Sequence, residues 1–289
     1  MNRNPSRVLV LGASGMLGNA VFRLYSSSPD YVVYGSTRTG SHHGLFPESI
    51  RGNLVELANA ENHDALVALV SEVRPDVVVN CIGLVKQLAS ANDPLAAIPI
   101  NSIFPHRVAR LCNLAGARLV HISTDCVFDG ADGNYTESSR PNAYDLYGRS
   151  KLLGEVDYDN AVTLRTSIIG RELNSAHSLI DWFLAQEGSV KGFTRAIFSG
   201  LPTLELARVI RDFVLPNPGL RGLYHVSAEA ISKHDLLQLV AEIYGKRIRI
   251  ERDNQLSIDR SLDSSRFRQA TGYDPPAWPA LIRAMRDFG

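Results

Sequence analysis

The sequence has few cysteines, no excess of charge of either sign and no long apolar segment. Three cysteines without a C-x-x-C pair exclude a disulfide framework and argue against a cysteine-based metal site. Lys+Arg and Asp+Glu number 30 each, so the overall charge gives no attraction to nucleic acid or to an anionic membrane surface. No run approaches the roughly 18 apolar residues of a membrane span, and the opening residues are too polar for a signal peptide. We expect a soluble, cytoplasmic protein that binds a small ligand and no metal, nucleic acid or membrane.

Short β-branched runs alternate with helical patterns through the first 170 residues. Several of these runs are continuously apolar, as strands covered on both faces are. Apolar residues at helical spacing occupy residues 16–25 and 63–73. The alternation predicts an α/β fold with a Rossmann-type doubly wound parallel sheet. The predicted strands lie at residues 8–11, 31–34, 77–81, 119–123 and 162–165.

Beyond residue 170 the strand and helix patterns no longer alternate regularly. Helical patterns are found at residues 178–187, 203–214 and 232–244, and a strand pattern at 223–226. Residues 216–219 are a turn cluster and not a linker. This part therefore predicts a smaller α+β domain.

A glycine-rich loop follows the first predicted strand. Residues 12–18 read G-x-x-G-x-x-G and lead into a helix. Glycines permit a tight turn, and a helix N-terminus offers free N–H groups to a pyrophosphate. The alternative is that the glycines only serve close packing of helix on strand. The dinucleotide interpretation assigns cofactor binding to Gly12, Ser14, Gly15, Met16 and Leu17.

The second predicted strand ends without the acidic residue that commonly binds a ribose 2′-hydroxyl. Residues 34–38 read Y-G-S-T-R. An arginine with neighbouring hydroxyls can bind the 2′-phosphate of NADP. Arg38 therefore favours NADP(H), with NAD(H) left open, and the alternative is a solvated loop arginine.

Tyr147 and Lys151 form a Y-x-x-x-K pair. On a helix, residues four apart share a face. A cation beside a phenol favours its ionised form, which equips Tyr147 to exchange a proton with a substrate oxygen. The pair follows a predicted strand that ends near Thr124, and doubly wound enzymes bind ligands at the carboxyl ends of strands. A Y-x-x-x-K spacing also occurs by chance, so the interpretation depends on where this pair lies in the predicted fold.

The glycine-rich loop, a threonine after the strand at residues 119–123 and the Y-x-x-x-K pair occur in this order. Together they resemble the extended short-chain dehydrogenase/reductase superfamily. The segments 123–130 (S-T-D-C-V-F-D-G), 147–155 (Y-G-R-S-K-L-L-G-E) and 200–203 (G-L-P-T) are similar to dTDP-4-dehydrorhamnose reductase and its relatives, which are sugar-nucleotide 4-ketoreductases. The resemblance implies a homodimer with a dinucleotide-binding domain at residues 1–169 and a return segment at about 203–228. It assigns residues 170–202 and 229–289 to substrate binding.

The same resemblance assigns roles to individual residues. It implies that Thr124 orients the carbonyl, Tyr147 donates the proton and Lys151 tunes the tyrosine. To the cofactor it adds Asn53, Leu54, Cys81, Ile82, Gly83, Tyr147, Lys151, Ser167 and Ile168. To the substrate it assigns Lys86, Thr124, Asp125, Cys126, Tyr147 and Arg260, although Lys86 and Arg260 are equally well explained as surface charges.

Two departures narrow the implied reaction. Cys126 replaces the family's usual tyrosine and supplies no carboxylate for a dehydratase. Residues 80–87 (N-C-I-G-L-V-K-Q) are more similar to relatives acting on UDP-linked 2-acetamido-2,6-dideoxy-4-ketohexoses. We expect NADPH-dependent reduction of a nucleotide-linked 6-deoxy-4-ketohexose of that type or of the dTDP-4-dehydrorhamnose type, for surface polysaccharide biosynthesis. The alternatives are a sugar-nucleotide 4-epimerase and a non-catalytic NADP-binding subunit resembling that of methionine adenosyltransferase.

Overall fold

The computed structural model describes residues 4–86, 89–173 and 178–289, so Gln87 of the 80–87 segment lies outside the described residues. The chain forms two compact units. Unit 1 comprises the chain up to Ser123 with Asp145–Leu164 and Pro218–Leu223, and unit 2 comprises Thr124–Tyr144, Arg165–Asn217 and Tyr224–Gly289. The domains expected from the sequence are defined by what each binds, and that division stays a prediction.

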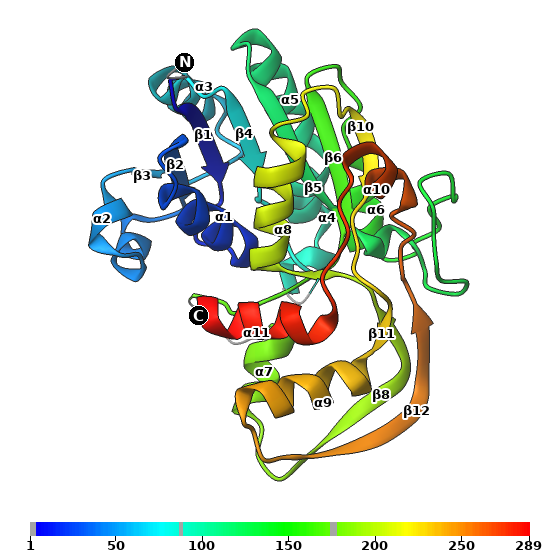
Figure 1. Ribbon diagram of the computed structural model, residues 1–289. Helices are drawn as coiled ribbons and strands as arrows, with labels where there is room; N and C mark the ends of the chain where they lie inside the picture. The colour runs from blue at the N-terminus through cyan, green and yellow to red at the C-terminus, as the bar shows by residue number, and fades with distance from the viewer. Residues whose placement is uncertain (1–3, 87–88, 174–177) are drawn as a thin grey trace. The chain divides into compact units, whose positions relative to one another are not determined.

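A seven-stranded sheet forms the centre of unit 1 (Figure 1), and the last residues of three of its strands fall in unit 2. β1 pairs in parallel with β2 on one side and with β4 on the other. The strand order reverses between β1 and β4, which is the switch point where doubly wound folds bind ligands. This confirms the predicted fold class. In spatial order the strands are β10 (Gly222–His225), β6 (Ala161–Thr166), β5 (Arg118–Thr124), β4 (Val77–Asn80), β1 (Ser6–Leu11), β2 (Tyr31–Thr37) and β3 (Leu54–Glu56).

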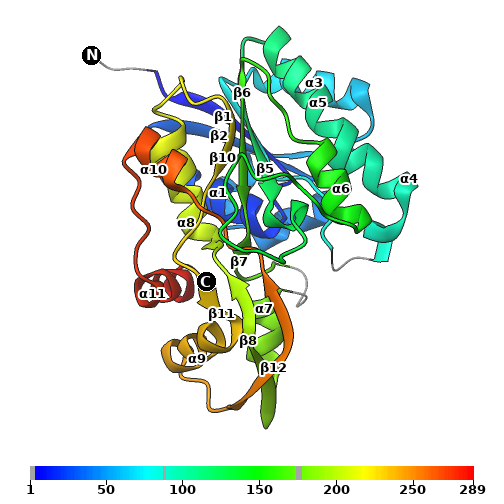
Figure 2. The same cartoon turned by 90° about the vertical axis from the view of Figure 1, so that its right-hand side faces the viewer.

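Helices cover both faces of this sheet. Figure 2 shows α1 (Met16–Ser26) on one face and α3 (His63–Val73), α5 (Phe104–Leu114) and α6 (Leu146–Leu153) on the other. The apolar stripes of α3 and α5 pack against β1, β4 and β5 in one buried cluster. Burial on both faces explains why these strands read as continuous apolar runs. Shorter helices are α2 (Glu48–Arg51) and α4 (Pro94–Ala97), and a π-helix spans Ile98–Ile103.

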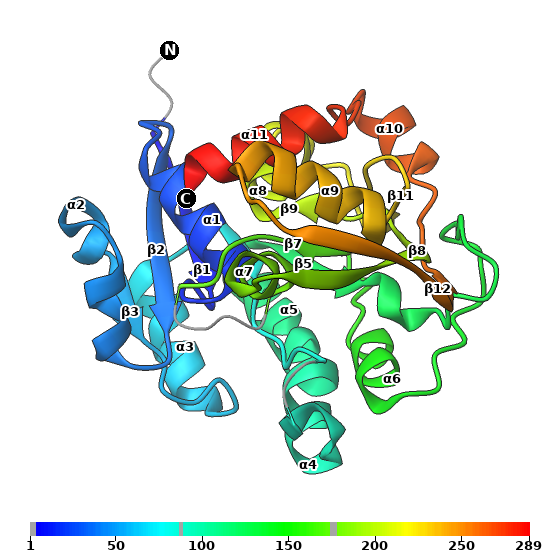
Figure 3. The same cartoon turned by 90° about the horizontal axis from the view of Figure 1, so that it is seen from below.

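Unit 2 mixes helices with a small sheet, as predicted. β8 pairs antiparallel with β11 and parallel with β12, and α9 packs along β8 (Figure 3). The helix predicted at residues 203–214 ends as an α-helix at Val209 and continues as a π-helix. The elements are β7 (Ile168–Ile169), α7 (Leu179–Ala185), β8 (Ser189–Phe198), β9 (Leu201–Pro202), α8 (Thr203–Val209), β11 (Ile231–Ser232), α9 (Lys233–Tyr244), β12 (Arg249–Asp259), α10 (Ser265–Thr271) and α11 (Trp278–Phe288).

The strands β3, β8 and β12 were not predicted from the sequence. β3 has three residues, too few to show a period. Most of β12 is exposed, and its pairing with β8 shifts register between Asp253 and Ser257, so neither strand has a regular apolar alternation. Among the described residues, no helix combines the length and apolarity needed to cross a membrane.

Candidate active site

The glycine loop joins β1 to α1, and two of its glycines are required by geometry. Gly12 has a φ of +83°, which L side chains rarely adopt. A Cβ on Gly18 would lie 2.1 Å from the Gly12 carbonyl oxygen. Gly15 is different, because it is exposed and a Cβ there would meet only the Gly12 carbonyl oxygen at 3.3 Å. Backbone conformation thus explains Gly12 and close packing explains Gly18, whereas Gly15 leaves the helix terminus open.

That terminus fits an anion. α1 begins after Gly15, has no side-chain cap and has no acidic residue in its first turn. The first N–H groups of a helix have no intrahelical acceptor and carry a partial positive charge. Ser14 and Met16 are partly buried, and Leu17 has its side chain in the core. The loop therefore fits the pyrophosphate of a dinucleotide, which Leu17 can bind only through its backbone.

The end of β2 lies directly beside this loop. Ser36 Oγ accepts a hydrogen bond from the Gly12 amide at 3.0 Å, and the Asn53 carbonyl accepts from the Gly35 amide at 3.0 Å. Leu54 pairs with Gly35 at the start of β3. Arg38 is exposed and makes no hydrogen bond or ion pair within the described part of the chain. The structure thus brings Arg38, Asn53 and Leu54 to the same edge as the glycine loop.

The end of β4 lines the other side of the loop. A Cβ on Gly12 would stand 3.0 Å from Ile82 Cγ1 and 3.4 Å from the Cys81 carbonyl. Burial raises the pKa of the Cys81 thiol to about 12, against the opposing charge of Lys151. The thiol is therefore neutral at physiological pH. Cys81 and Ile82 offer an uncharged wall, and Gly83 follows them on the surface.

The helix α6 carries Tyr147 and Lys151. Asp145 caps this helix by accepting from the Gly148 amide at 2.8 Å, and Lys86 Nζ lies 2.8 Å from Asp145 Oδ2. Tyr147 is partly buried, whereas Lys151 is buried and donates from Nζ to the Ile122 carbonyl at 2.8 Å. The Y-x-x-x-K spacing thus places the lysine against β5.

The pKa of Lys151 is about 8, below its usual value. Burial lowers it, and the negative charge of Glu155 opposes that effect. Glu155 lies four residues along the chain and accepts a hydrogen bond from Ser123 Oγ at 2.7 Å. The lysine therefore loses its charge as pH rises through about 8.

The sequence interpretation missed Asn101, a buried residue of the π-helix. Its side chain accepts from the Leu84 amide at 2.9 Å and donates to Ser150 Oγ at 3.2 Å. A Cβ on Gly154 would lie 1.9 Å from the Asn101 carbonyl oxygen. Asn101 therefore joins the segment after β4 to α6. Its partners are far away in the sequence, so no local signal reveals it, whereas the N-cap preference for aspartate could have revealed Asp145.

The predicted residues of unit 2 gather around a buried acid. Thr124 Oγ1 accepts from the Cys126 amide at 3.1 Å and donates to Asp125 Oδ1 at 3.2 Å. Burial raises the pKa of Asp125, and the charge of Arg260 and hydrogen bonds from Cys126, Thr124 and Ser167 oppose the rise. Unit 2 thus places a threonine hydroxyl on a carboxyl group that tends toward its neutral form.

Arg260 and Ile168 are fixed by backbone contacts of unit 2. Arg260 Nε donates to the Phe128 carbonyl at 2.7 Å, and that is its only hydrogen bond to the described residues. Ile168 pairs with Leu201, and the Ser167 carbonyl accepts from the Leu201 amide at 2.8 Å. The two terminal guanidinium nitrogens of Arg260 stay available to a ligand.

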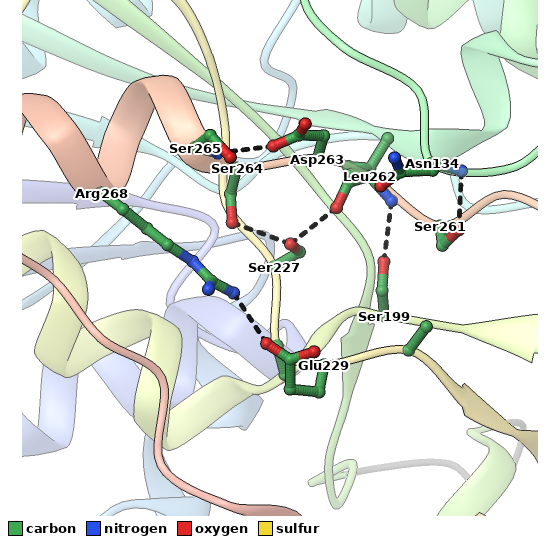
Figure 4. Close-up of a pocket in the computed structure, with 12 residues that line it drawn as sticks. Asn134, Ser199, Ser227, Glu229, Ser261, Leu262, Asp263, Ser264, Ser265 and Arg268 are labelled. Carbon is green, nitrogen blue, oxygen red and sulfur yellow. Dashed lines mark hydrogen bonds and ion pairs between the residues drawn. The ribbon is translucent and has the colours of Figure 1, made fainter.

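A separate polar pocket of about 250 Å³ opens within unit 2 (Figure 4). Ser227 Oγ bonds the Leu262 carbonyl at 2.9 Å, and Arg268 pairs with Glu229 at 3.2 Å. None of the described residues that line it was predicted from the sequence to be a catalytic, cofactor-binding or substrate-binding residue. The same part of the chain holds no group of three or more His, Cys, Asp or Glu side chains that could bind a metal ion.

Comparisons with known proteins place these features in a family. Methionine adenosyltransferase 2 subunit beta of Danio rerio is 30% identical over 252 residues, 82% of this chain and 74% of that protein. The probable low-salt glycan biosynthesis reductase Agl14 of Haloferax volcanii is 29% identical over 250 residues, 82% of this chain and 79% of that protein.

Solved structures share the fold. The dTDP-4-dehydrorhamnose reductase of Bacillus anthracis in complex with NADP has a TM-score of 0.82 at 20% identity, covering 100% of both chains. A hypothetical dTDP-4-dehydrorhamnose reductase of Sulfolobus tokodaii has a TM-score of 0.76 at 27% identity, covering 94% of this chain and 98% of that one. The predicted resemblance is confirmed for family and fold. Residues 6–285 match the model described as RmlD substrate binding domain, and the chain belongs to that family.

Proposed function

We propose that the chain is an NADPH-dependent oxidoreductase that reduces the 4-keto group of a nucleotide-linked 6-deoxy-4-ketohexose. The observation that carries the proposal is the pair on α6, Tyr147 with a buried Lys151 bonded to the Ile122 carbonyl at 2.8 Å. The proposed substrate is of the UDP-2-acetamido-2,6-dideoxy-hexulose or dTDP-4-dehydrorhamnose type. Surface polysaccharide biosynthesis, a cytoplasmic location and a homodimer belong to the same proposal.

Bound NADPH would supply a hydride to the keto carbon. Tyr147 would give its proton to the alkoxide formed at the substrate oxygen, and Lys151 would hold the nicotinamide ribose while its charge favours tyrosinate. Thr124 stands two residues beyond Ile122 on β5 and holds the substrate oxygen. Its hydroxyl hydrogen points to Asp125 Oδ1 at 3.2 Å, so the hydroxyl must turn toward the substrate when it binds.

The cofactor assignment draws on the open helix terminus after Gly15 and on the exposed Arg38, which has no hydrogen bond or ion pair to the described residues. NADP is bound in the Bacillus anthracis reductase, whereas a dTDP-glucose 4,6-dehydratase of the same fold holds NAD. NADP(H) is therefore the preferred cofactor, and NAD(H) is the alternative. We retain the cofactor and substrate residues named from the sequence, with Arg260 facing the substrate diphosphate through its terminal nitrogens.

Tyr147→Phe tests the proposal, because it removes only the hydroxyl. We expect turnover of a 4-ketosugar nucleotide, followed by NADPH absorbance, to fall by about 10²- to 10⁴-fold while NADPH binding changes less than about twofold. Tyr144→Phe is the matched control, since Tyr144 is 80% exposed and has no lysine four residues on. Unaltered turnover in Tyr147→Phe would refute the assignment.

A second candidate function is a non-catalytic subunit, which the 30% identity to the methionine adenosyltransferase subunit of Danio rerio favours. Co-purification with a methionine adenosyltransferase, together with no reduction of any ketosugar, would select it. A 4-epimerase is the third possibility. It would convert the substrate without net consumption of NADPH.

A further inference from the structure

Glu56 places a carboxylate at the cofactor edge although β2 ends without one. It is the last residue of β3 and pairs in register with Thr37, the last residue of β2. Glu56 Oε2 accepts a hydrogen bond from the Gly40 amide at 3.0 Å. This contact fastens the chain just after Arg38 to the neighbouring strand.

The hydroxyls beside Arg38 are also engaged within the turn. Thr37 Oγ1 donates to the Thr39 carbonyl at 3.2 Å and lies 3.1 Å from His43 Nε2. Because its only hydrogen goes to Thr39, Thr37 accepts from the histidine. Thr39 Oγ1 lies 2.7 Å from Ser41 Oγ. Of the two hydroxyls that the sequence suggested for the 2′-phosphate, that of Thr37 thus holds the turn and that of Ser36 is buried and accepts from the Gly12 amide. Arg38 is the exposed side chain of that segment left for the ligand.

We propose that Glu56 is a positioning residue for recognition of the 2′-phosphate: by holding Gly40 it fixes the turn of residues 37–40 and leaves the Arg38 guanidinium available to the ligand. The inference rests on the proposed use of NADPH. A turn ordered before binding lowers the entropy lost when the ligand binds. Glu56 makes no ion pair with Arg38 among the described contacts, so it does not compete with the phosphate for the guanidinium.

The charge and the hydrogen bond of Glu56 act in opposite directions on a phosphate. The carboxylate repels the dianion, whereas its acceptor oxygen orders the turn. Glu56→Gln keeps an acceptor and removes the charge, and Glu56→Ala removes both. A positioning role therefore predicts weaker phosphate binding in Glu56→Ala but not in Glu56→Gln. Simple repulsion predicts tighter binding in both variants.

Calorimetric binding of 2′,5′-ADP and 5′-AMP to the full chain tests this without any turnover. We expect Glu56→Ala to weaken 2′,5′-ADP by about five- to tenfold, the effect of one hydrogen bond, and to leave 5′-AMP within about twofold. Glu56→Gln should bind 2′,5′-ADP as tightly as the unaltered protein or more tightly. His43→Ala removes another contact of the same turn, so it should also weaken the binding of 2′,5′-ADP.

Arg38→Ala provides the control. It should abolish the preference for 2′,5′-ADP, and Glu56→Ala should add no further loss in that background. Tighter 2′,5′-ADP binding in both Glu56 variants would overturn the positioning role, as would equal weakening of the two ligands. If the unaltered protein does not distinguish the ligands, NADPH selectivity and this inference both fail. A preference without ketosugar reduction would contradict the reductase proposal alone.

Discussion

The two units bury ionisable groups of opposite sign and shift both toward the neutral form. In unit 1, burial lowers the pKa of Lys151 to about 8. In unit 2, burial raises the pKa of Asp125. Each group keeps partners that oppose the shift, because a buried charge without partners is too costly. The same physical effect thus equips one unit with a weakly basic amine and the other with a weakly acidic carboxyl.

The units differ in where those partners come from. Lys151 is influenced by Glu155, four residues along the chain, and the glycine loop is set by backbone geometry. Asp125 is influenced by Ser167 and Arg260, which come from distant segments of unit 2. The charge that opposes the pKa shift of Lys151 therefore lies close to it in the sequence, whereas the charge that opposes the pKa shift of Asp125 is brought in by folding.

Of the changes that compare the two units, a side chain at Gly18 in unit 1 should have the strongest effect. Gly18→Ala places a Cβ 2.1 Å from the Gly12 carbonyl oxygen, so we expect 2′,5′-ADP to bind about 10- to 100-fold more weakly by calorimetry. Gly219→Ala is the control, with nothing within 4 Å of its added Cβ.

Gly200→Ala extends this test to unit 2, because its Cβ would lie equally close, 2.1 Å, to the Ser167 carbonyl oxygen. This change should leave binding of the adenine fragment intact. Equal loss in both variants would break the comparison, since the fragment would then depend on unit 2 as much as on unit 1.

A smaller effect is expected on the pH dependence of reduction. Lys151 is an ammonium below its pKa of about 8 and neutral above it, so kcat/KM for the ketosugar should fall as pH rises through about 8. Glu155→Gln removes a negative charge that raises this pKa, and the midpoint should move to lower pH in a pH–rate profile.

Ser123→Ala separates the charge of Glu155 from its hydrogen bond. It removes the 2.7 Å bond to Glu155 and keeps the carboxylate, so its midpoint should move less than that of Glu155→Gln. A midpoint that stays fixed in Glu155→Gln would show that another group limits the rate. Asp125→Asn, a change in unit 2, should not move the midpoint of the fall in kcat/KM near pH 8.

The smallest effect concerns backbone strain in each unit. Arg74 ends α3 with a φ of 48° and Asn134 has a φ of 47°. Asparagine tolerates this region and arginine does not, so Arg74→Gly should stabilise the fold by about 0.5 kcal/mol and Asn134→Gly by about zero. Denaturant unfolding checks both values, and an equal gain at the two positions would contradict the difference.

The parallel sheet and the glycine loop could be predicted from the order of the residues alone. Strands covered on both faces must be apolar throughout, and a turn with a φ of +83° at Gly12 needs glycine, so both features are visible in the residue order. The spacing of Tyr147 and Lys151 likewise puts them on one helix face. These are consequences of backbone geometry within a few residues.

The surroundings of those residues follow from the tertiary fold and could not be predicted from the sequence. Lys151 meets the Ile122 carbonyl 29 residues away, Asn101 reaches Ser150 across 49 residues, and Glu56 supplies a carboxylate to a turn that begins on another strand. The exposed β12 and the three-residue β3 also escaped detection because pairing, and not an apolar pattern, makes them strands. Burial and partners fix the charge of an ionisable group, and both depend on segments that are distant in the chain.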